Sequence, residues 1–104
     1  MKRNTVISLL KEGKVLFSYP LKATWQNGEG VLIVTAPKRN FKRAVKRNLL
    51  KRRIREAFRL NSAILGDFSP DIFFYYAAKE EESFETISKS VRKILSDLAS
   101  SQND

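Results

Sequence analysis

The sequence predicts an α+β protein, a two-layer α/β sandwich in which helices pack against a sheet. Two hydrophobic patterns lead to this fold class. Apolar residues recur at three- and four-residue steps in three stretches, as in amphipathic helices, and they alternate or run together in between, as in strands. The resulting order is α-β-β-(β)-α-β-α, with a long basic helix in the crossover. Since neither repeats nor linkers interrupt this order, we expect residues 1–104 to form a single domain.

The beginning of the chain predicts a short helix and then extended segments. Residues 4–10 have a helical pattern that a glycine closes at position 13. Residues 14–26 alternate between apolar and polar side chains, and Pro20 interrupts them at a break or an edge position. One alternating set consists of Leu21, Ala23 and Trp25. If that set faces the core, Lys22 and Thr24 lie on the open side of the sheet.

The next segment predicts a hairpin and a central strand. The dipeptide Asn27-Gly28 is a strong hairpin signal, because both residue types tolerate the backbone angles of tight turns. Val31–Ala36 is almost entirely apolar, which favours a strand in the middle of the sheet. Pro37 ends this strand and opens the basic part of the chain.

A long helix is predicted from about Arg43 to Leu60, with Gly66 as its stop. Its apolar residues recur at helical spacing and are expected to face the core. They are Val45, Leu49, Leu50, Ile54, Ala57 and Phe58.

The last part of the chain predicts a strand and a closing helix. Asp71–Ala78 is a continuous apolar run of high β-propensity, which suits a central strand buried on both faces. Alternatively one of its faces, Phe73 with Tyr75 or Phe74 with Tyr76, offers rings for base stacking; core packing is the favoured interpretation. Ser83 then caps a helix whose apolar stripe is Phe84, Ile87, Val91, Ile94, Leu95 and Leu98.

Positive charge is concentrated in residues 38–59. This stretch holds 11 of the 20 lysines and arginines and one acid, Glu56, so it carries +10, whereas the rest of the chain nets −1. A folded domain gains nothing from holding like charges together, so the segregation indicates a polyanionic partner. Four of the cations step by four residues and form one ridge on the predicted helix: Arg47, Lys51, Arg55 and Arg59.

Two other interpretations of this stretch are weaker. A merely solvated face alternates basic and acidic residues at four-residue spacing, and here only Glu56 could serve. A membrane-surface helix carries bulky apolar residues outward, whereas this stripe resembles core. Neither an apolar run of roughly 20 residues nor a convincing signal peptide is present, so we expect a cytoplasmic protein with no membrane partner.

The composition argues against a self-sufficient catalyst. The chain has neither cysteine nor histidine, which removes disulfides, thiolate nucleophiles, Cys/His metal sites and the commonest general base. The acidic run Glu80–Glu82 is typical of a solvated turn, and the four glycines stand apart from one another, unlike those of a phosphate loop. We therefore predict no catalytic residue and no metal site on this chain.

Three segments of the basic stretch form a signature: Pro37-Lys38-Arg39, Ala44-Val45-Lys46-Arg47-Asn48, and the run KRRIREAFR from Lys51 to Arg59. Together with the short N-terminal helix, the strand introduced by Asp71 and the closing helix, they resemble the protein subunit of bacterial ribonuclease P over essentially the whole chain. Four positions depart from that family's pattern. Leu49 stands where a second arginine is expected, Lys42 where glycine is frequent, and Val6 and Leu10 where aromatic residues are common.

The resemblance implies a fold like the second domain of ribosomal protein S5. It also implies a ribonucleoprotein endonuclease that removes the 5′ leader of precursor tRNA. The implied partners are the ribonuclease P RNA and the precursor tRNA with its leader, with no obligate protein partner. In that family the RNA and its Mg²⁺ ions carry catalysis, which agrees with the missing catalytic side chains.

Two binding surfaces are predicted. The surface for the catalytic RNA consists of Lys38, Arg39, Lys42, Arg43, Lys46, Arg47, Asn48, Lys51, Arg52, Arg55 and Arg59. A cleft between the N-terminal helix and the open sheet face would hold the leader. Matching to the family assigns Val6, Leu10, Lys22 and Thr24 to it, and Phe17, Tyr19 and Trp25 are further stacking candidates, with core packing as the rival.

The main alternative is a ribosomal or other RNA- or DNA-binding module that uses the basic helix without nuclease activity. A groove-reading helix projects Asn, Gln or Arg toward base edges from one face, whereas this one is charged almost all round and offers only Asn48. A protein-only nuclease would need clustered carboxylates, which the sequence does not provide.

Overall fold

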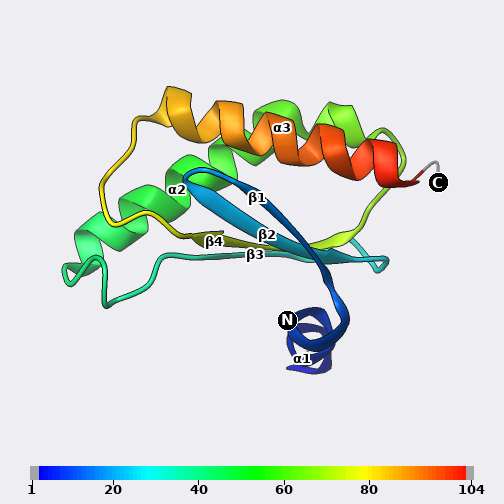
Figure 1. Cartoon of the computed structure of the whole chain (residues 1–104), viewed down its shortest axis with the longest axis horizontal. Coiled ribbons are helices and arrows are strands. Elements are labelled where there is room, and N and C mark those ends of the chain that lie inside the picture. Colours follow the sequence, from blue (N-terminus) through cyan, green and yellow to red (C-terminus); the bar gives the residue numbers. More distant parts are fainter. Residues whose placement is uncertain (1–2, 103–104) are drawn as a thin grey trace.

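The computed structural model describes the backbone of residues 3–102 and the side chains of residues 8–101. Three α-helices, a short 3-10 helix and four strands follow one another in the predicted order (Figure 1). They are α1 (Arg3–Glu12), β1 (Lys14–Ser18), β2 (Leu21–Gln26), β3 (Leu32–Thr35), α2 (Ala44–Asn61), η1 (Ser62–Leu65), β4 (Asp71–Tyr76) and α3 (Phe84–Gln102). The predicted α+β class and element order are confirmed.

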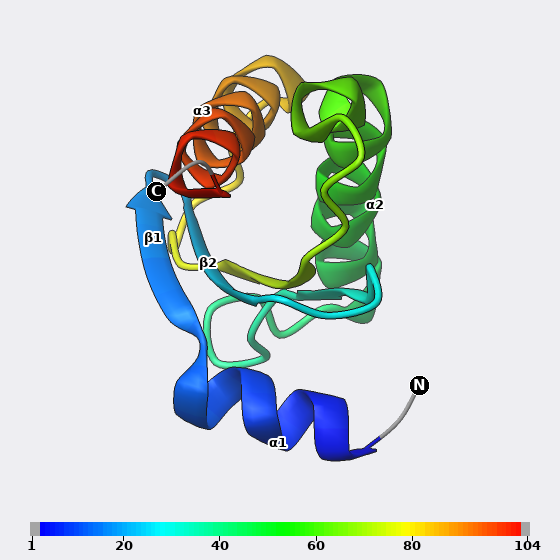
Figure 2. The same ribbon diagram turned by 90° about the vertical axis from the view of Figure 1, so that its right-hand side faces the viewer.

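The two faces of the sheet are covered unequally. Helices α2 and α3 lie side by side on one face, and α1 lies alone against the other (Figure 2). The core therefore forms between the sheet and the α2/α3 layer. The second face is left largely open beyond α1, which makes it available for binding.

The strand order is β1-β2-β4-β3, and it corrects two predictions. The prediction of a hairpin at Asn27-Gly28 is wrong, because β2 pairs with β4 and not with β3. The central position of β3 is wrong as well: β3 is an edge strand that pairs in parallel with β4. The prediction of a central strand over Asp71–Ala78 is confirmed in its place, since β4 (Asp71–Tyr76) pairs on both sides. Its burial on both faces is wrong, because Phe73 and Tyr75 are only half-buried.

Asp71, the first residue of β4, explains why β4 lies between β2 and β3. Its buried carboxylate accepts hydrogen bonds from the backbone N–H groups of Glu29 and Val31, at 3.0 and 2.9 Å. The loop between β2 and β3 is thereby wrapped around the start of β4. A side chain at Gly28 would meet the same carboxylate within 2.0 Å, so this loop position requires a residue without Cβ.

The core is built by alternation along the strands. Ile72, Phe74 and Tyr76 of β4 point into it, as do Leu21, Ala23 and Trp25 of β2. Both helices contribute apolar stripes that are fully buried: Leu50, Ile54 and Ala57 from α2, and Ile87, Val91, Ile94, Leu95 and Leu98 from α3. Each truncation of such a side chain to alanine typically costs about 2–5 kcal/mol, so this layer dominates the stability of the fold.

Val45 is a correction to the predicted stripe of the long helix. It lies in the first turn of α2 and is 80% exposed. Five residues separate it from Leu50, which rotates it about 140° away from the core at 100° per residue. Leu49 and Phe58 are half-buried at the margins of the stripe.

The ends of the helices follow the sequence signals. The hydroxyl of Ser83 accepts a hydrogen bond from the Thr86 N–H at 3.2 Å and so caps α3, as predicted. Helix α2 continues into η1, and the chain turns away at Gly66 with φ +60°.

Asp71→Asn tests the anchoring role of this carboxylate. Burial alone would raise the Asp71 pKa, but the hydrogen bonds from Val31, Gln26 and Glu29 more than offset burial and hold the pKa below its ordinary 3.8. The charged form therefore contributes stability above pH 4 that is lost as the pH falls through the lowered pKa. We expect Asp71→Asn to reduce the unfolding free energy at pH 7 by about 1.5–3 kcal/mol, measured by urea denaturation.

The exposed Asp67 supplies the matched control. Asp67→Asn should leave the unfolding free energy within about 0.5 kcal/mol of the parent value. Asp71→Asn should also flatten the loss of stability as the pH falls below 4. A parallel pH profile for parent and Asp71→Asn would contradict the anchoring role.

Candidate nucleic-acid interface

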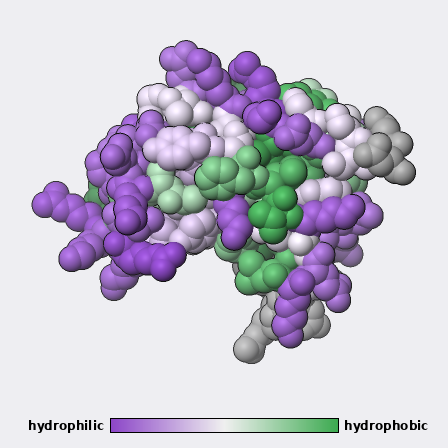
Figure 3. Space-filling view, in the orientation of Figure 1, coloured by the Kyte–Doolittle hydropathy of each residue, from purple (hydrophilic) through white to green (hydrophobic). Residues whose placement is uncertain are grey.

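The open face of the sheet carries two rows of side chains. Strand register places Phe17, Lys22, Tyr75 and Thr35 in one row across the four strands, and Val15, Thr24, Phe73 and Ile33 in the next. Directly opposed residues share a face of a sheet, so each row combines aromatic or aliphatic groups with polar ones. Figure 3 shows this hydrophobic surface over β1 and the adjoining part of α1.

Helix α1 converts this face into a cleft. A hollow of about 360 Å³ is lined by Leu10 of α1 and by Lys22, Thr24, Phe73, Tyr75 and Arg39. The helix approaches the sheet closely at its end, where a Cβ on Gly13 would meet the Leu9 carbonyl oxygen at 2.4 Å and the Thr24 methyl at 2.6 Å. Glycine at position 13 therefore allows α1, the wall of the cleft, to approach the sheet that forms its floor.

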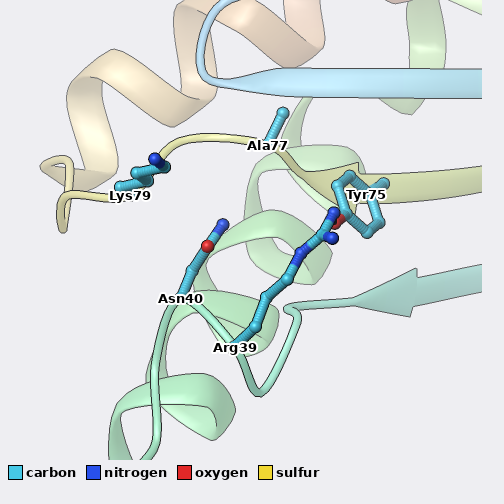
Figure 4. A pocket seen from close by; sticks show the side chains of 5 residues that line it. All are labelled: Arg39, Asn40, Tyr75, Ala77 and Lys79. Carbon is cyan, nitrogen blue, oxygen red and sulfur yellow. The ribbon is translucent and has the colours of Figure 1, made fainter.

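A second hollow, of about 630 Å³, adjoins the first. Arg39, Asn40, Tyr75, Ala77 and Lys79 line it, and Arg39 and Tyr75 belong to both hollows. The Arg39 guanidinium reaches across from the loop after β3 and donates to the Tyr75 hydroxyl at 3.2 Å (Figure 4). The two hollows thus form one groove, which runs from α1 to the basic loop that precedes α2.

The predicted cleft residues divide into three groups. Leu10, Lys22 and Thr24 line the groove, although Thr24 is buried in its floor. Phe17 is 63% exposed and shares the row of Lys22, which extends the groove over β1. The side chain of Val6 lies outside the described residues.

Two predicted stacking residues do not face the groove. Trp25 is 5% exposed and packs edge-to-face on Phe68, with ring centroids 5.9 Å apart, because odd-numbered residues of β2 point to the core. Tyr19 follows β1 in a turn, and its hydroxyl donates to Glu82 at 2.9 Å, close to the start of α3. Trp25 is therefore a core residue and Tyr19 belongs to another surface.

The groove also contains six residues that were absent from the predicted cleft: Arg39, Asn40, Phe73, Tyr75, Ala77 and Lys79. Phe73 and Tyr75, one of the two alternative stacking faces of the predicted strand, are half-buried on the open face while Ile72, Phe74 and Tyr76 fill the core. Seven consecutive apolar residues, 72–78, hide the alternation of this strand, so the sequence does not decide between its two faces. Arg39 was predicted for the basic surface, and its link to Tyr75 joins that surface to the groove.

The cations of residues 38–59 are mostly exposed around the outer side of α2 and the loop before it. The exposed cations are Lys38, Arg39, Lys42, Arg43, Arg52, Arg55 and Arg59, and the partly exposed ones are Lys46, Arg47, Lys51 and Arg53. Asn48, the uncharged member of the predicted surface, is exposed as well. Figure 3 shows hydrophilic side chains gathered where α2 begins. Among the described side chains, eight of the eleven cations make no ion pair with a carboxylate.

Arg47 differs from its neighbours on the predicted ridge. Its guanidinium donates to the carbonyl oxygens of Phe41 and Lys42, at 2.8 and 2.9 Å. Helix α2 has no side-chain cap at Arg43, so Arg47 ties the incoming loop to the first turn instead. Its role is at least partly structural.

The acidic run Glu80–Glu82 is docked on α2, unlike the solvated turn that was predicted. Glu81 pairs with Lys46 and with Arg53, the latter at 2.9 Å, and these hydrogen bonds hold the pKa of Glu81 below its usual range. The Tyr76 hydroxyl donates to the Glu80 carbonyl oxygen at 2.6 Å and accepts from the Glu82 N–H at 2.8 Å. Burial raises the pKa of Tyr76 to about 12, so this support persists at neutral pH. At the far end of α2, Arg59 pairs with Glu56.

Comparison with known proteins bears on the partner of these surfaces. The family model described as Ribonuclease P matches residues 2–99. The chain belongs to the ribonuclease P protein family. A Ribonuclease P protein component from Porphyromonas gingivalis is 32% identical over 109 residues, which cover 93% of this chain and 80% of that protein.

Solved structures agree with this family assignment. The RNase P protein of Thermotoga maritima matches with a TM-score of 0.76 at 26% identity, covering 91% of each chain. The RNase P protein of Staphylococcus aureus has the same TM-score at 22% identity, covering 94% of this chain and 92% of that one, and it supports the fold alone.

Within residues 3–102, no helix combines the length and hydropathy of a bilayer span.

Arg47→Ala is expected to destabilise this ribonuclease P protein. Loss of two hydrogen bonds to backbone carbonyl groups should lower the unfolding free energy by about 1–2 kcal/mol. Arg55→Ala removes an exposed guanidinium from the same helix and should change the unfolding free energy by less than about 0.5 kcal/mol. Urea denaturation of the two variants at pH 7 makes the comparison. Equal stabilities would show that the contacts of Arg47 do not hold the loop.

Proposed function

We propose that this protein binds the catalytic RNA of ribonuclease P through α2 and holds the single-stranded 5′ leader of precursor tRNA in the groove. The RNA carries the cleavage chemistry and the protein positions the substrate. The observation that carries this proposal is the continuity of the two surfaces. Arg39 belongs both to the basic loop before α2 and to the lining of the groove, so an RNA docked on the basic surface lies next to a strand held in the groove.

The basic side suits a folded RNA. Five cations of the basic surface have no carboxylate partner in the described part of the chain: Lys42, Arg43, Lys51, Arg52 and Arg55. A phosphate group that binds them therefore does not have to displace a carboxylate of the protein. Their binding would release counterions from the RNA and give affinity that falls with salt. Arginine is favoured for this role because its planar guanidinium can engage a phosphate through two parallel hydrogen bonds.

The groove suits a single strand of variable sequence. Phe17, Phe73 and Tyr75 offer rings or ring edges at the surface, and Lys22 and Arg39 supply charge beside them. Stacking and charge tolerate any base, because every base has a π-face and every nucleotide carries a phosphate. The groove is therefore a better match to a leader than to a base-paired duplex.

We assign the Mg²⁺ ions of the reaction to the RNA. Within the described residues, no three His, Cys, Asp or Glu side chains gather where they could hold a metal ion. The side chains of this protein act on the substrate by orientation. Fixing the leader beside the RNA raises the effective concentration of the scissile phosphate at the catalytic centre.

A reconstitution assay tests the function as a whole. The purified chain, added at low Mg²⁺ to a bacterial ribonuclease P RNA with labelled precursor tRNA, should stimulate release of the leader. Cleavage by the protein alone would overturn the proposal. RNA binding without stimulation would favour the alternative of a binding module outside ribonuclease P.

Arg52→Ala tests the docking surface. The side chain is exposed and makes no ion pair among the described residues, so its loss should leave the thermal melt unchanged. We expect weaker binding to the catalytic RNA at moderate salt. The slope of log Kd against log salt concentration should fall by about 1, which corresponds to the loss of one phosphate contact. Lys89→Ala, on α3 and outside the basic surface, is the control. Unchanged affinity of Arg52→Ala at low salt would count against docking through α2.

Phe17→Ala and Tyr19→Ala form a matched pair for the groove. Both rings are more than half exposed, but Phe17 shares the open face with Lys22 and Tyr19 does not line the groove. Loss of one stacked base costs about 1–3 kcal/mol, so Phe17→Ala should weaken holoenzyme binding of leader-bearing precursor by about tenfold. Tyr19→Ala should leave this affinity unchanged. Equal effects of Phe17→Ala on substrates with and without a leader would contradict the assignment.

A further inference from the structure

One flank of α2 is apolar in the midst of the cations. Val45 is 80% exposed, and Leu49, one helical turn further along, is half-buried. A shallow hollow of about 400 Å³ is lined by Val45, Asn48, Leu49 and Arg52. A second hollow of about 400 Å³ is lined by Leu49, Arg52, Arg53, Glu56 and Phe84. Because the hollows share Leu49 and Arg52, they form one surface, which we call the Leu49 strip.

The Leu49 strip lies apart from the groove. Its residues come from the outer flank of α2 and from Phe84 at the start of α3, on the helical layer, whereas the groove lies on the opposite face of the sheet (Figure 2). None of its residues lines the groove. The strip therefore needs an occupant other than the strand in the groove.

Charge around the Leu49 strip favours a nucleic acid as the occupant. Its carboxylate, Glu56, is paired with Arg59, and the neighbouring Glu81 is paired with Lys46 and Arg53. Arg52 makes no ion pair in the described part of the chain and lines both hollows. The strip thus presents net positive charge at its rim and aliphatic and aromatic groups within.

The residue types of the Leu49 strip suit a base better than a phosphate. Leu49 and Val45 offer an apolar floor, which cannot neutralise an anion but can contact the flat face of a base. The Arg52 guanidinium and the Phe84 ring are planar groups on which a base can stack, and the Asn48 amide can bond to a base edge.

We propose that the Leu49 strip binds one unstacked nucleobase of the catalytic RNA, next to the phosphates held by Arg52 and Arg55. This inference rests on the proposed function and adds to it a base contact on the outer flank of α2. Such a contact contributes affinity that does not depend on counterion release. It also makes Leu49 a residue that selects for an unpaired base in the partner RNA.

The test measures affinity for a ribonuclease P RNA over a range of salt concentrations. Leu49→Ala should weaken binding by roughly five- to tenfold at every salt concentration, which leaves the salt slope unchanged. Leu49→Arg should steepen the slope by about one phosphate contact and bind more weakly than the parent at high salt. Leu60→Ala, on the same helix but outside both hollows, should bind like the parent. Thermal melts verify that each variant is folded.

Base-specific chemical probing gives the second readout. One base that the parent protein protects on the RNA should become reactive again with Leu49→Ala while the surrounding backbone protection persists. Parent-like affinity of Leu49→Ala, alongside weakened binding by Arg52→Ala, would overturn the base contact and leave the proposed function standing. Parent-like affinity of both variants would overturn the proposed function as well. If Leu49→Ala abolished self-association of the protein but kept the RNA affinity of the parent, the strip would be a contact between two copies of the chain, which would overturn the proposal.

Discussion

The carboxylate of Asp71 is the interaction on which the rest of the structure depends. It fixes the loop between β2 and β3 around the start of β4, so β4 occupies the middle of the sheet. It also accepts a hydrogen bond from the Gln26 amide at 3.4 Å, whose oxygen accepts from Ser8 of α1 at 3.1 Å. Strand order and the wall of the groove are thereby tied to one buried charge. Such a network is stable only when every member is satisfied, and the described residues contain no buried side-chain polar atom without a partner.

The basic surface is sorted into cations that hold the protein together and cations that face outward. Arg47 serves the loop before α2, and Lys46 and Arg53 are bound by Glu81 on a loop that Tyr76 supports from the core. The outward set is what remains, and it follows the loop and outer side of α2 toward Arg39. This division lets a segment with ten excess charges, residues 38–59, be part of a stable domain. The internal pairs relieve repulsion near the acidic loop, and under the proposed function a polyanion relieves the rest.

Much of the fold could be predicted from sequence because its signals are local. Helical spacing, the Ser83 cap and the aromatic run of β4 gave each element and the order of elements. The strand order could not be predicted in this way, since Asn27-Gly28 suits a hairpin by itself and the competing bonds come from Asp71, more than 40 residues away. The signature located the basic surface, but the roles of Arg47 and Lys46 depend on tertiary partners. Likewise the alternation in β4 that turns Tyr75 outward is invisible in a run of uniformly apolar residues.

The described end of helix α1, residues 8–12, is held to the sheet by few contacts, and this has a consequence for the groove. Among its side chains from residue 8 onward, Leu9 is fully buried, Ser8 makes one hydrogen bond to Gln26, and the following residues are exposed. An end of a helix with so little buried apolar area opens at a smaller free energy than the two-helix layer on the other side of the sheet. The wall of the groove beside Leu10 is therefore the part of the groove that opens most easily while the core stays folded. The width of the groove at this point follows that local opening.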